Sequence, residues 1–185
     1  MINVKPTKGK LLVSEPTILT DVSFNRSVIL LTSHDDEGSV GFIFNKPLDL
    51  CLRDVIPEID SDLPIYNGGP VSQDNLYFVH NIPQLIPDSE KISENLYWGG
   101  DFDILKQLLK DDELLDADIR FFLGYSGWSS QQLEDELEEE AWLVINNNYE
   151  NIFTTEYDSF WKDELMRCGG TYQLWANAPE NPTLN

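Results

Sequence analysis

The stretch Gly124-Tyr125-Ser126-Gly127-Trp128-Ser129-Ser130-Gln131-Gln132-Leu133-Glu134 joins an apolar run to an acidic segment. The run that leads into it, residues 119–125 (IRFFLGY), is too apolar for an edge strand and predicts a strand in the middle of a sheet. After it, the Ser129 hydroxyl and Gln132 match a capping box and predict a helix that begins near Ser129. The stretch is therefore predicted to form a strand, a glycine-hinged turn and a helix, a setting that can hold a serine nucleophile.

Further elements follow from hydrophobic periodicity and turn residues. Residues 27–33 and 40–45 predict a β-hairpin around the turn at 34–38, and residues 10–14, 75–80, 93–98 and 142–145 predict further strands. Helices are predicted at 50–55, after the N-cap Asp101, and from about 155 to 168, where Gly169-Gly170 stops the last one. In the acidic helix after Ser129, Leu133, Leu137 and Ala141 face the core, and the acids, Glu136 among them, face water.

Length and composition indicate one cytoplasmic domain. The chain has 185 residues, 41% of them hydrophobic, which suits a single domain over residues 1–185 with frayed ends at 1–8 and 177–185. No secretory signal opens the chain, and no apolar run approaches the ~20 residues of a membrane-spanning helix. The two cysteines, Cys51 and Cys168, lie far apart without a Cys/His cluster, so neither a disulfide framework nor a metal site is predicted, and no motif calls for a cofactor.

The charge balance bears on the partner. The chain carries 33 acidic and 12 basic residues, a net charge of −21. Nucleic-acid affinity depends on Lys and Arg that neutralise phosphates, so this charge disfavours a general DNA- or RNA-binding surface, and it also repels anionic membranes. A solvated acidic surface is the simplest interpretation, and another protein is the expected partner.

Four ordered groups of residues, covering nearly the whole chain, resemble the YqgE/AlgH family of bacterial proteins. They are residues 24–28 (FNRSV), 41–47 (GFIFNKP), 68–71 (GGPV), and 124–128 (GYSGW) with 132–134 and 141–143. The resemblance implies an α+β fold, a mixed and strongly curved, barrel-like sheet flanked by helices. Family members are often labelled transcriptional regulators, after a link to alginate production, and no catalytic residues are established for them. Glu140 stands where relatives commonly have an asparagine before the Ala-Trp pair, so a role for that asparagine does not carry over.

Ser126 is the candidate nucleophile, but its expected companions are missing. A nucleophile elbow needs a second glycine where this chain has Trp128, and a hydrolase places its histidine after the serine. The chain has only His34 and His80, both before it. A structural turn whose glycines allow close packing is the alternative interpretation, and the chain is predicted not to be an enzyme.

A second candidate site is a pocket for a small anion. Arg26, Asn45 and Lys46 lie at strand boundaries, and the loop Gly68-Gly69-Pro70 could approach them. Gly124, Tyr125, Ser126 and Trp128 would form further walls of this pocket. Alternatively, Arg26 pairs with a carboxylate and Asn45-Lys46-Pro47 only ends a strand. Three hypotheses therefore remain: a protein that acts through protein contacts with an indirect effect on transcription, an anion sensor, and a hydrolase that uses Ser126.

Overall fold

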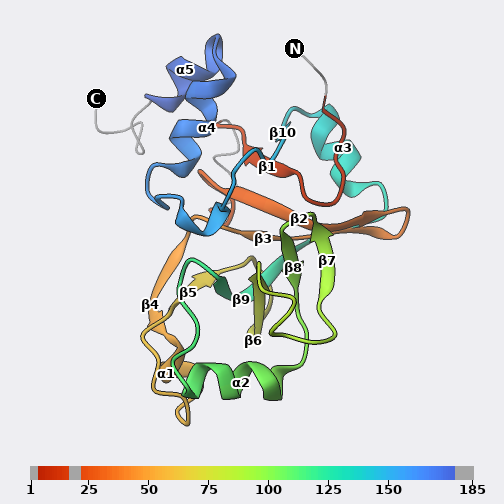
Figure 1. Cartoon of the computed structure of the whole chain (residues 1–185). Helices are drawn as coiled ribbons and strands as arrows, with labels where there is room; N and C mark the ends of the chain where they lie inside the picture. Colours follow the sequence, from red (N-terminus) through yellow and green to blue (C-terminus); the bar gives the residue numbers. More distant parts are fainter. Residues whose placement is uncertain (1–3, 17–21, 178–185) are drawn as a thin grey trace.

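The computed structural model describes residues 4–16 and 22–177, which form an α+β unit around one ten-stranded sheet (Figure 1). The remaining parts of the predicted frayed ends, residues 1–3 and 178–185, lie outside the described residues. The strands are β1 (Leu11–Ser14), β2 (Val28–Asp35), β3 (Gly38–Ile43), β4 (Pro47–Cys51), β5 (Pro64–Asn67), β6 (Val71–His80), β7 (Glu90–Ser93), β8 (Leu96–Trp98), β9 (Ile119–Ser129) and β10 (Trp142–Ile145).

The sheet is open. Its main path runs β10-β1-β2-β3-β9-β6-β8-β7, and β5 joins as a parallel neighbour of β9, with β4 paired to β5. Among the described residues the terminal strands β10 and β7 do not pair with each other, so the closed, barrel-like curvature implied by the family resemblance is not confirmed. The coarser prediction, a mixed sheet flanked by helices, is confirmed.

β9 is the central strand, as the apolar run predicts. Its first half pairs with β5 and β6, and its second half, Ser126–Ser129, pairs with Gly38–Gly41 of β3. The predicted turn at residues 124–128 is wrong, because the strand continues through it. Gly124 has φ +71°, a conformation open to glycine, which bends β9 without ending it and turns it from one half of the sheet to the other.

The hairpin of β2 and β3 is confirmed, with antiparallel register from Ile29–Ile43 to Asp35–Gly38 and a bulge between Leu31 and Ser33. The short strand at Trp142–Ile145 is also confirmed, and it pairs with β1. Together β1, β2, β3 and β10 make the upper half of Figure 1, and β4 to β8 make the lower half.

The helices are α1 (Leu52–Val55), α2 (Phe102–Lys110), α3 (Gln132–Glu138), α4 (Phe160–Cys168) and α5 (Thr171–Ala176), with a 3-10 turn, η1, at Ile152–Thr154. The Asp101 cap is confirmed, because its side chain accepts from the backbone N–H groups of Asp103 and Ile104. None of the helices in the described ranges is long and apolar enough to cross a membrane.

Three helix predictions need correction. α3 begins at Gln132, since Gln131 adopts φ +67° and precedes it without a side-chain cap; Gln132 instead accepts from the Ser129 N–H at 3.0 Å and closes the end of β9. α4 begins at Phe160, because residues 155–159 form a bend and a turn between η1 and the helix. α5 follows directly after Gly169-Gly170, where no further helix is predicted.

Three clusters of buried side chains fill the unit. One lies between the sheet and α4 and α5, another beneath α1 and α2, and a third between β10, β9 and α3. α4 and α5 therefore cover one end of the molecule and α1 and α2 the other, which Figure 1 shows at the top and bottom.

Candidate functional site

The predicted Gly68-Gly69 loop lies against the bend of β9, and we call this contact the glycine crossing (Gly68, Gly69, Gly124, Tyr125 and Ser126). The Gly68 N–H donates to the Leu123 carbonyl at 2.9 Å, and the Gly68 carbonyl accepts from the Ile43 N–H at 3.1 Å. A Cβ atom on Gly68 would lie 2.2 Å from the Gly124 carbonyl oxygen, and one on Gly69 would lie 2.3 Å from that of Tyr125. Backbone therefore packs directly on backbone here, which requires glycine.

Ser126 is fully buried within this crossing. Its hydroxyl donates to the Gly68 carbonyl at 3.0 Å. His34 is engaged elsewhere, with Nδ1 2.8 Å from the Ser39 hydroxyl, and the buried His80 contacts the Gly99 carbonyl through Nε2 at 3.1 Å. The Ser126 hydroxyl thus links β9 to the glycine loop through a hydrogen bond. It is not accessible to solvent, and neither histidine contacts it.

The other residues of the predicted anion pocket, Arg26, Asn45 and Lys46, contact groups within the protein itself. Asn45 accepts from the Val28 N–H at 2.8 Å and donates to the Arg26 carbonyl at 2.9 Å, so it ties the entry of β2 to the end of β3. The Lys46 ammonium donates to the Ser23 carbonyl at 2.8 Å, and the Arg26 guanidinium lies 5.0 Å from the centre of the Trp161 ring. The Ile43 N–H of β3 donates to the Gly68 carbonyl, so the end of β3 before Asn45 lies beside the glycine crossing. Anion binding by this group stays a prediction.

Trp128, the remaining predicted wall, belongs to a buried clamp. Its indole N–H donates to Glu136 Oε2 at 2.8 Å, and the Trp142 indole donates to the same oxygen at 2.7 Å. Glu136 was predicted to face water. It lies half-buried because its carboxylate satisfies two indole donors that would otherwise be unpaired between α3 and the sheet. Pro70, by contrast, is exposed at the end of the glycine loop.

A different feature has the form of a binding site. A pocket of about 650 Å³ runs along β10 between that strand, the loop 146–150, α4 and α5, and we call it the β10 groove. It is lined by Val4, Leu143, Val144, Ile145, Asn146, Asn148, Tyr149, Glu150, Glu164, Arg167, Cys168 and Tyr172. This volume lies in the usual range for binding pockets, and the lining combines apolar walls with a few polar groups.

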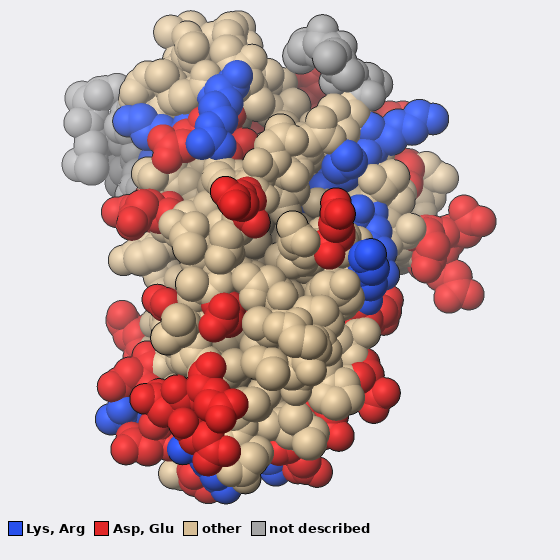
Figure 2. All heavy atoms as spheres, in the orientation of Figure 1, with Lys and Arg blue, Asp and Glu red and all other residues tan. Residues whose placement is uncertain are grey.

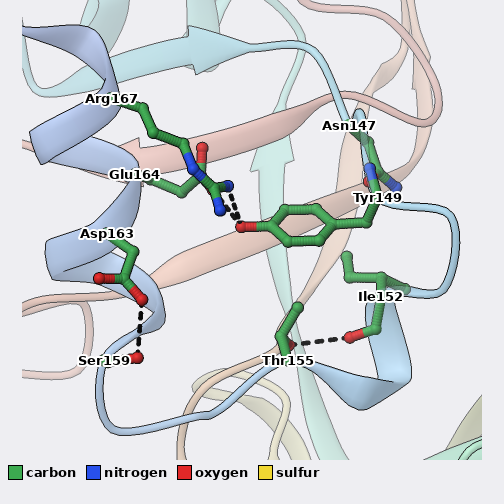
Figure 3. A network of polar contacts seen from close by, with 8 residues as sticks. All are labelled: Asn147, Tyr149, Ile152, Thr155, Ser159, Asp163, Glu164 and Arg167. Carbon is green, nitrogen blue, oxygen red and sulfur yellow. Dashed lines mark hydrogen bonds and ion pairs between the residues drawn. The ribbon is translucent and has the colours of Figure 1, made fainter.

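Polar groups converge at one side of the β10 groove (Figure 3). Tyr149 points from the loop after β10 toward α4, where its hydroxyl donates to Glu164 and accepts from Arg167. Arg167 Nη1 also lies 2.5 Å from Glu164 Oε1, and the guanidinium lies 5.1 Å from the centre of the Tyr149 ring. Because the Glu164 side chain is only 7% exposed, this network fixes a nearly buried carboxylate beside the groove.

The network changes the proton affinity of its members. Burial, followed by the hydrogen bond to Glu164, raises the pKa of Tyr149 to about 12. Burial and the nearby Glu164 raise the pKa of the Cys168 thiol, which keeps it protonated and poorly nucleophilic. Within the described residues no group of three or more His, Cys, Asp and Glu side chains could hold a metal ion.

Tyr149, Glu164 and Arg167 are not among the residues that the sequence predicted for a site. The one signal available was the spacing of Glu164 and Arg167, which places opposite charges on neighbouring turns of a helix. Such pairs are common on solvated helix faces, and nothing in the sequence places Tyr149 opposite them.

Comparisons with known proteins agree with the fold. A model of the family described as AlgH-like matches residues 11–173. A UPF0301 protein of Bacteroides fragilis is 41% identical over 185 residues, which cover 99% of this chain and 93% of that protein. A UPF0301 protein of Cytophaga hutchinsonii is 43% identical over 181 residues, with coverage of 97% and 99%.

Two solved structures resemble this one. The crystal structure of a Corynebacterium diphtheriae protein has a TM-score of 0.75 at 21% identity and covers 96% of this chain and 95% of its own. The solution structure of AlgH from Pseudomonas aeruginosa has a TM-score of 0.72 at 25% identity, with coverage of 98% and 100%. Both share the fold over nearly their full length.

Proposed function

We propose a binding function for this chain, which belongs to the AlgH-like family. In this proposal it is a cytoplasmic, non-enzymatic protein that acts through contacts with another protein. Any effect on transcription is then indirect. The observation that carries the proposal is the β10 groove. An apolar groove beside the last strand of a sheet is a place where another chain can bind.

The arrangement of β10 supports this role. Within residues 4–16 and 22–177, β10 pairs with β1 alone, so it is an edge strand there, and residues 143–145 of this strand line the groove. An extended segment can add to such an edge through main-chain hydrogen bonds, while pockets beside it select side chains. Leu143 and Ile145, which are only partly buried, would supply the apolar contacts on the strand side.

Exposed apolar side chains also lie on the neighbouring helices. Leu174 is 77% exposed, and Trp175 and Met166 are about 41% and 40% exposed. These side chains lie on α4 and α5, at the same end of the molecule as the groove. Exposed apolar side chains at this end of the molecule support a protein partner, since contact would remove them from water.

Charge argues against direct binding to nucleic acid. The chain has a net charge of −21, and Figure 2 shows Asp and Glu gathered over the lower end of the molecule, around α1 and α2. Phosphate recognition needs the opposite distribution. A regulator with this surface would therefore act on another protein.

Photo-crosslinking in the bacterial cell tests the proposal. A photoreactive amino acid at Asn148, which lines the β10 groove, is expected to give a discrete protein adduct, while the same probe at the exposed Leu115 gives none of that size. The adduct should disappear when Leu143→Asp places a charge in the groove. An adduct that persists in the folded Leu143→Asp protein would contradict groove binding, and tight, salt-sensitive DNA binding in a gel-shift assay would contradict the indirect action.

A further inference from the structure

Arg120 is a buried cation in the central strand. The residue is 5% exposed, and its guanidinium lies 4.3 Å from the centre of the Tyr66 ring and 5.1 Å from that of Phe44. Its Nη1 donates to the Phe44 carbonyl and its Nη2 to the Phe153 carbonyl, both at 2.8 Å. These bonds use two of the several N–H donors that a guanidinium carries.

None of the described carboxylates neutralises this cation at close range. Among the residues that the structure describes, no Asp or Glu oxygen lies within the 4.0 Å of an ion pair with Arg120. Burial lowers the pKa of Arg120, and the nearby Tyr66 and then Asp116, which lies beyond ion-pair distance, oppose this effect. A buried charge without a counter-ion is unfavourable, and an anionic group from outside the chain would stabilise it.

Arg120 lines an open pocket of about 630 Å³, which we call the Arg120 pocket. Its other lining residues come from β4, β5, the loop before β9, and η1 with the residues after it. Three acidic residues in this lining, Asp49, Asp116 and Glu156, are exposed, whereas Arg120 is buried. The Arg120 pocket therefore combines one cation in its buried wall with carboxylates at its solvent side.

This distribution of charge selects among ligands. A phosphate or a dicarboxylate could pair with Arg120, but its second negative charge would face the three acids. A molecule with one carboxylate and one ammonium group satisfies both ends, because the carboxylate can pair with the guanidinium while the ammonium lies among the acids. In an α-amino acid one carbon carries both groups, and the volume of the pocket leaves room for its side chain.

We propose that the Arg120 pocket binds a free α-amino acid or a closely similar zwitterion, with its carboxylate on Arg120 and its ammonium group between Asp116 and Glu156. This site is separate from the β10 groove and involves none of its lining residues. It would give the protein a small-molecule input that does not depend on the protein contact proposed above.

Thermal-shift and calorimetric measurements with the free L-amino acids test this inference on the full chain. At least one amino acid is expected to raise the melting temperature, whereas its N-acetyl and carboxamide derivatives, which each lack one charge, bind at least tenfold more weakly. Binding of none of them, or equal binding of the N-acetyl derivative, would overturn the proposal.

Variants locate the binding. Asp116→Asn with Glu156→Gln removes charge from exposed positions without disturbing the core, and it should weaken binding of the amino acid at least tenfold. Asp74→Asn with Glu138→Gln, two exposed acids elsewhere, is the matched control and should leave binding unchanged. Arg120→Met should abolish binding if it folds; if it does not, the Arg120 Nε resonance of the wild-type protein should shift on addition of the amino acid. Unchanged binding in the Asp116/Glu156 variant, or an Nε resonance that does not move, would overturn the assignment.

Discussion

The glycine crossing and the β10 groove are built in opposite ways. At the glycine crossing, backbone packs directly on backbone, and the Ser126 hydroxyl donates its hydrogen bond to the Gly68 carbonyl. At the β10 groove, side chains from a strand, a loop and two helices surround space that is open to a ligand. The first region holds the two halves of the sheet together, and the second offers a surface.

The difference explains why the first region is visible in the sequence. A contact that only glycine permits fixes the residue type at each position, so it produces a short motif such as GGPV or GYSGW. The groove requires only that apolar and polar side chains meet, which many residues satisfy. In this molecule the motif therefore marks close packing of backbone on backbone, and the β10 groove lies elsewhere.

The largest expected effect comes from breaking the glycine crossing. Gly69→Ala places a Cβ 2.3 to 2.4 Å from backbone atoms of Tyr125 and Ser126, at φ +147°. Because none of these atoms can move without shifting β9, the free energy of unfolding should fall by about 3 kcal/mol or more. Urea denaturation measures it.

Gly99→Ala is the matched control. Gly99 also has a positive φ, +63°, but a Cβ there meets nothing within 4 Å. Its cost should be about 1 kcal/mol, from backbone conformation alone. Equal losses in the two variants would show that backbone strain, and not the close approach of β9, explains the glycines.

Next in size is the clamp behind Trp128. Glu136→Ala leaves two indole N–H groups, those of Trp128 and Trp142, without their acceptor, and should cost about 2 to 3 kcal/mol. Glu138→Ala, an exposed acid on the same helix, should change stability by less than about 0.5 kcal/mol. Similar losses of stability in both variants would mean that water replaces Glu136 as the acceptor of the two indole N–H groups. Glu136 would then contribute no more than a solvated acid of the same helix.

Much of the fold follows from patterns within single segments. The central strand, the β2–β3 hairpin and α2 with its Asp101 cap were predictable because periodicity and capping act over a few residues. The strand at 124–129 was not predictable. Gly124 bends β9 instead of ending it, and only the pairing with β3 distinguishes a bend from a strand end. The sequence places the start of α3 too early. The contact between Ser129 and Gln132 exists, but it closes the end of β9 instead of capping the helix.

Little of the candidate sites followed from the sequence. Arg120 is the single cation in an apolar strand, and only the packing of Phe44, Tyr66 and Phe153 around it shows that it is buried. Tyr149 meets Glu164 and Arg167 because the loop after β10 turns toward α4, a tertiary contact without a local pattern. Residues that meet only in the folded chain leave no fixed spacing to detect.

A moderate effect is expected in the β10 groove. Arg167→Ala removes the cation beside the nearly buried Glu164, and we expect a loss of about 1 to 2 kcal/mol, reduced because the Arg167 side chain is 60% exposed. Arg53→Ala is the comparison, since Arg53 pairs with Asp60 and Asp62, whose side chains are 92% and 82% exposed. Its cost should stay below about 0.5 kcal/mol. If Arg167→Ala cost no more than Arg53→Ala, the network would be an ordinary surface pair.

The smallest effect is a pH dependence at Tyr149, on the polar side of the β10 groove. The folded protein raises the pKa of Tyr149 from 10.0 to about 12. Between these pH values the unfolded chain loses the phenol proton and the folded chain keeps it. The contribution of Tyr149 to the free energy of unfolding is therefore fully present below pH 10 and declines toward pH 12.

Tyr149→Phe cannot lose this proton. It should be less stable than the wild type below pH 10, and the gap should narrow by about 1 kcal/mol by pH 12, since solvent screens a half-exposed ring. Lysine titration affects both proteins alike and cancels from the difference. A gap that stays constant across this range would mean that Tyr149 is neither buried nor held by Glu164 in solution. This side of the groove would then lack the fixed polar groups that distinguish it from a simple apolar cleft.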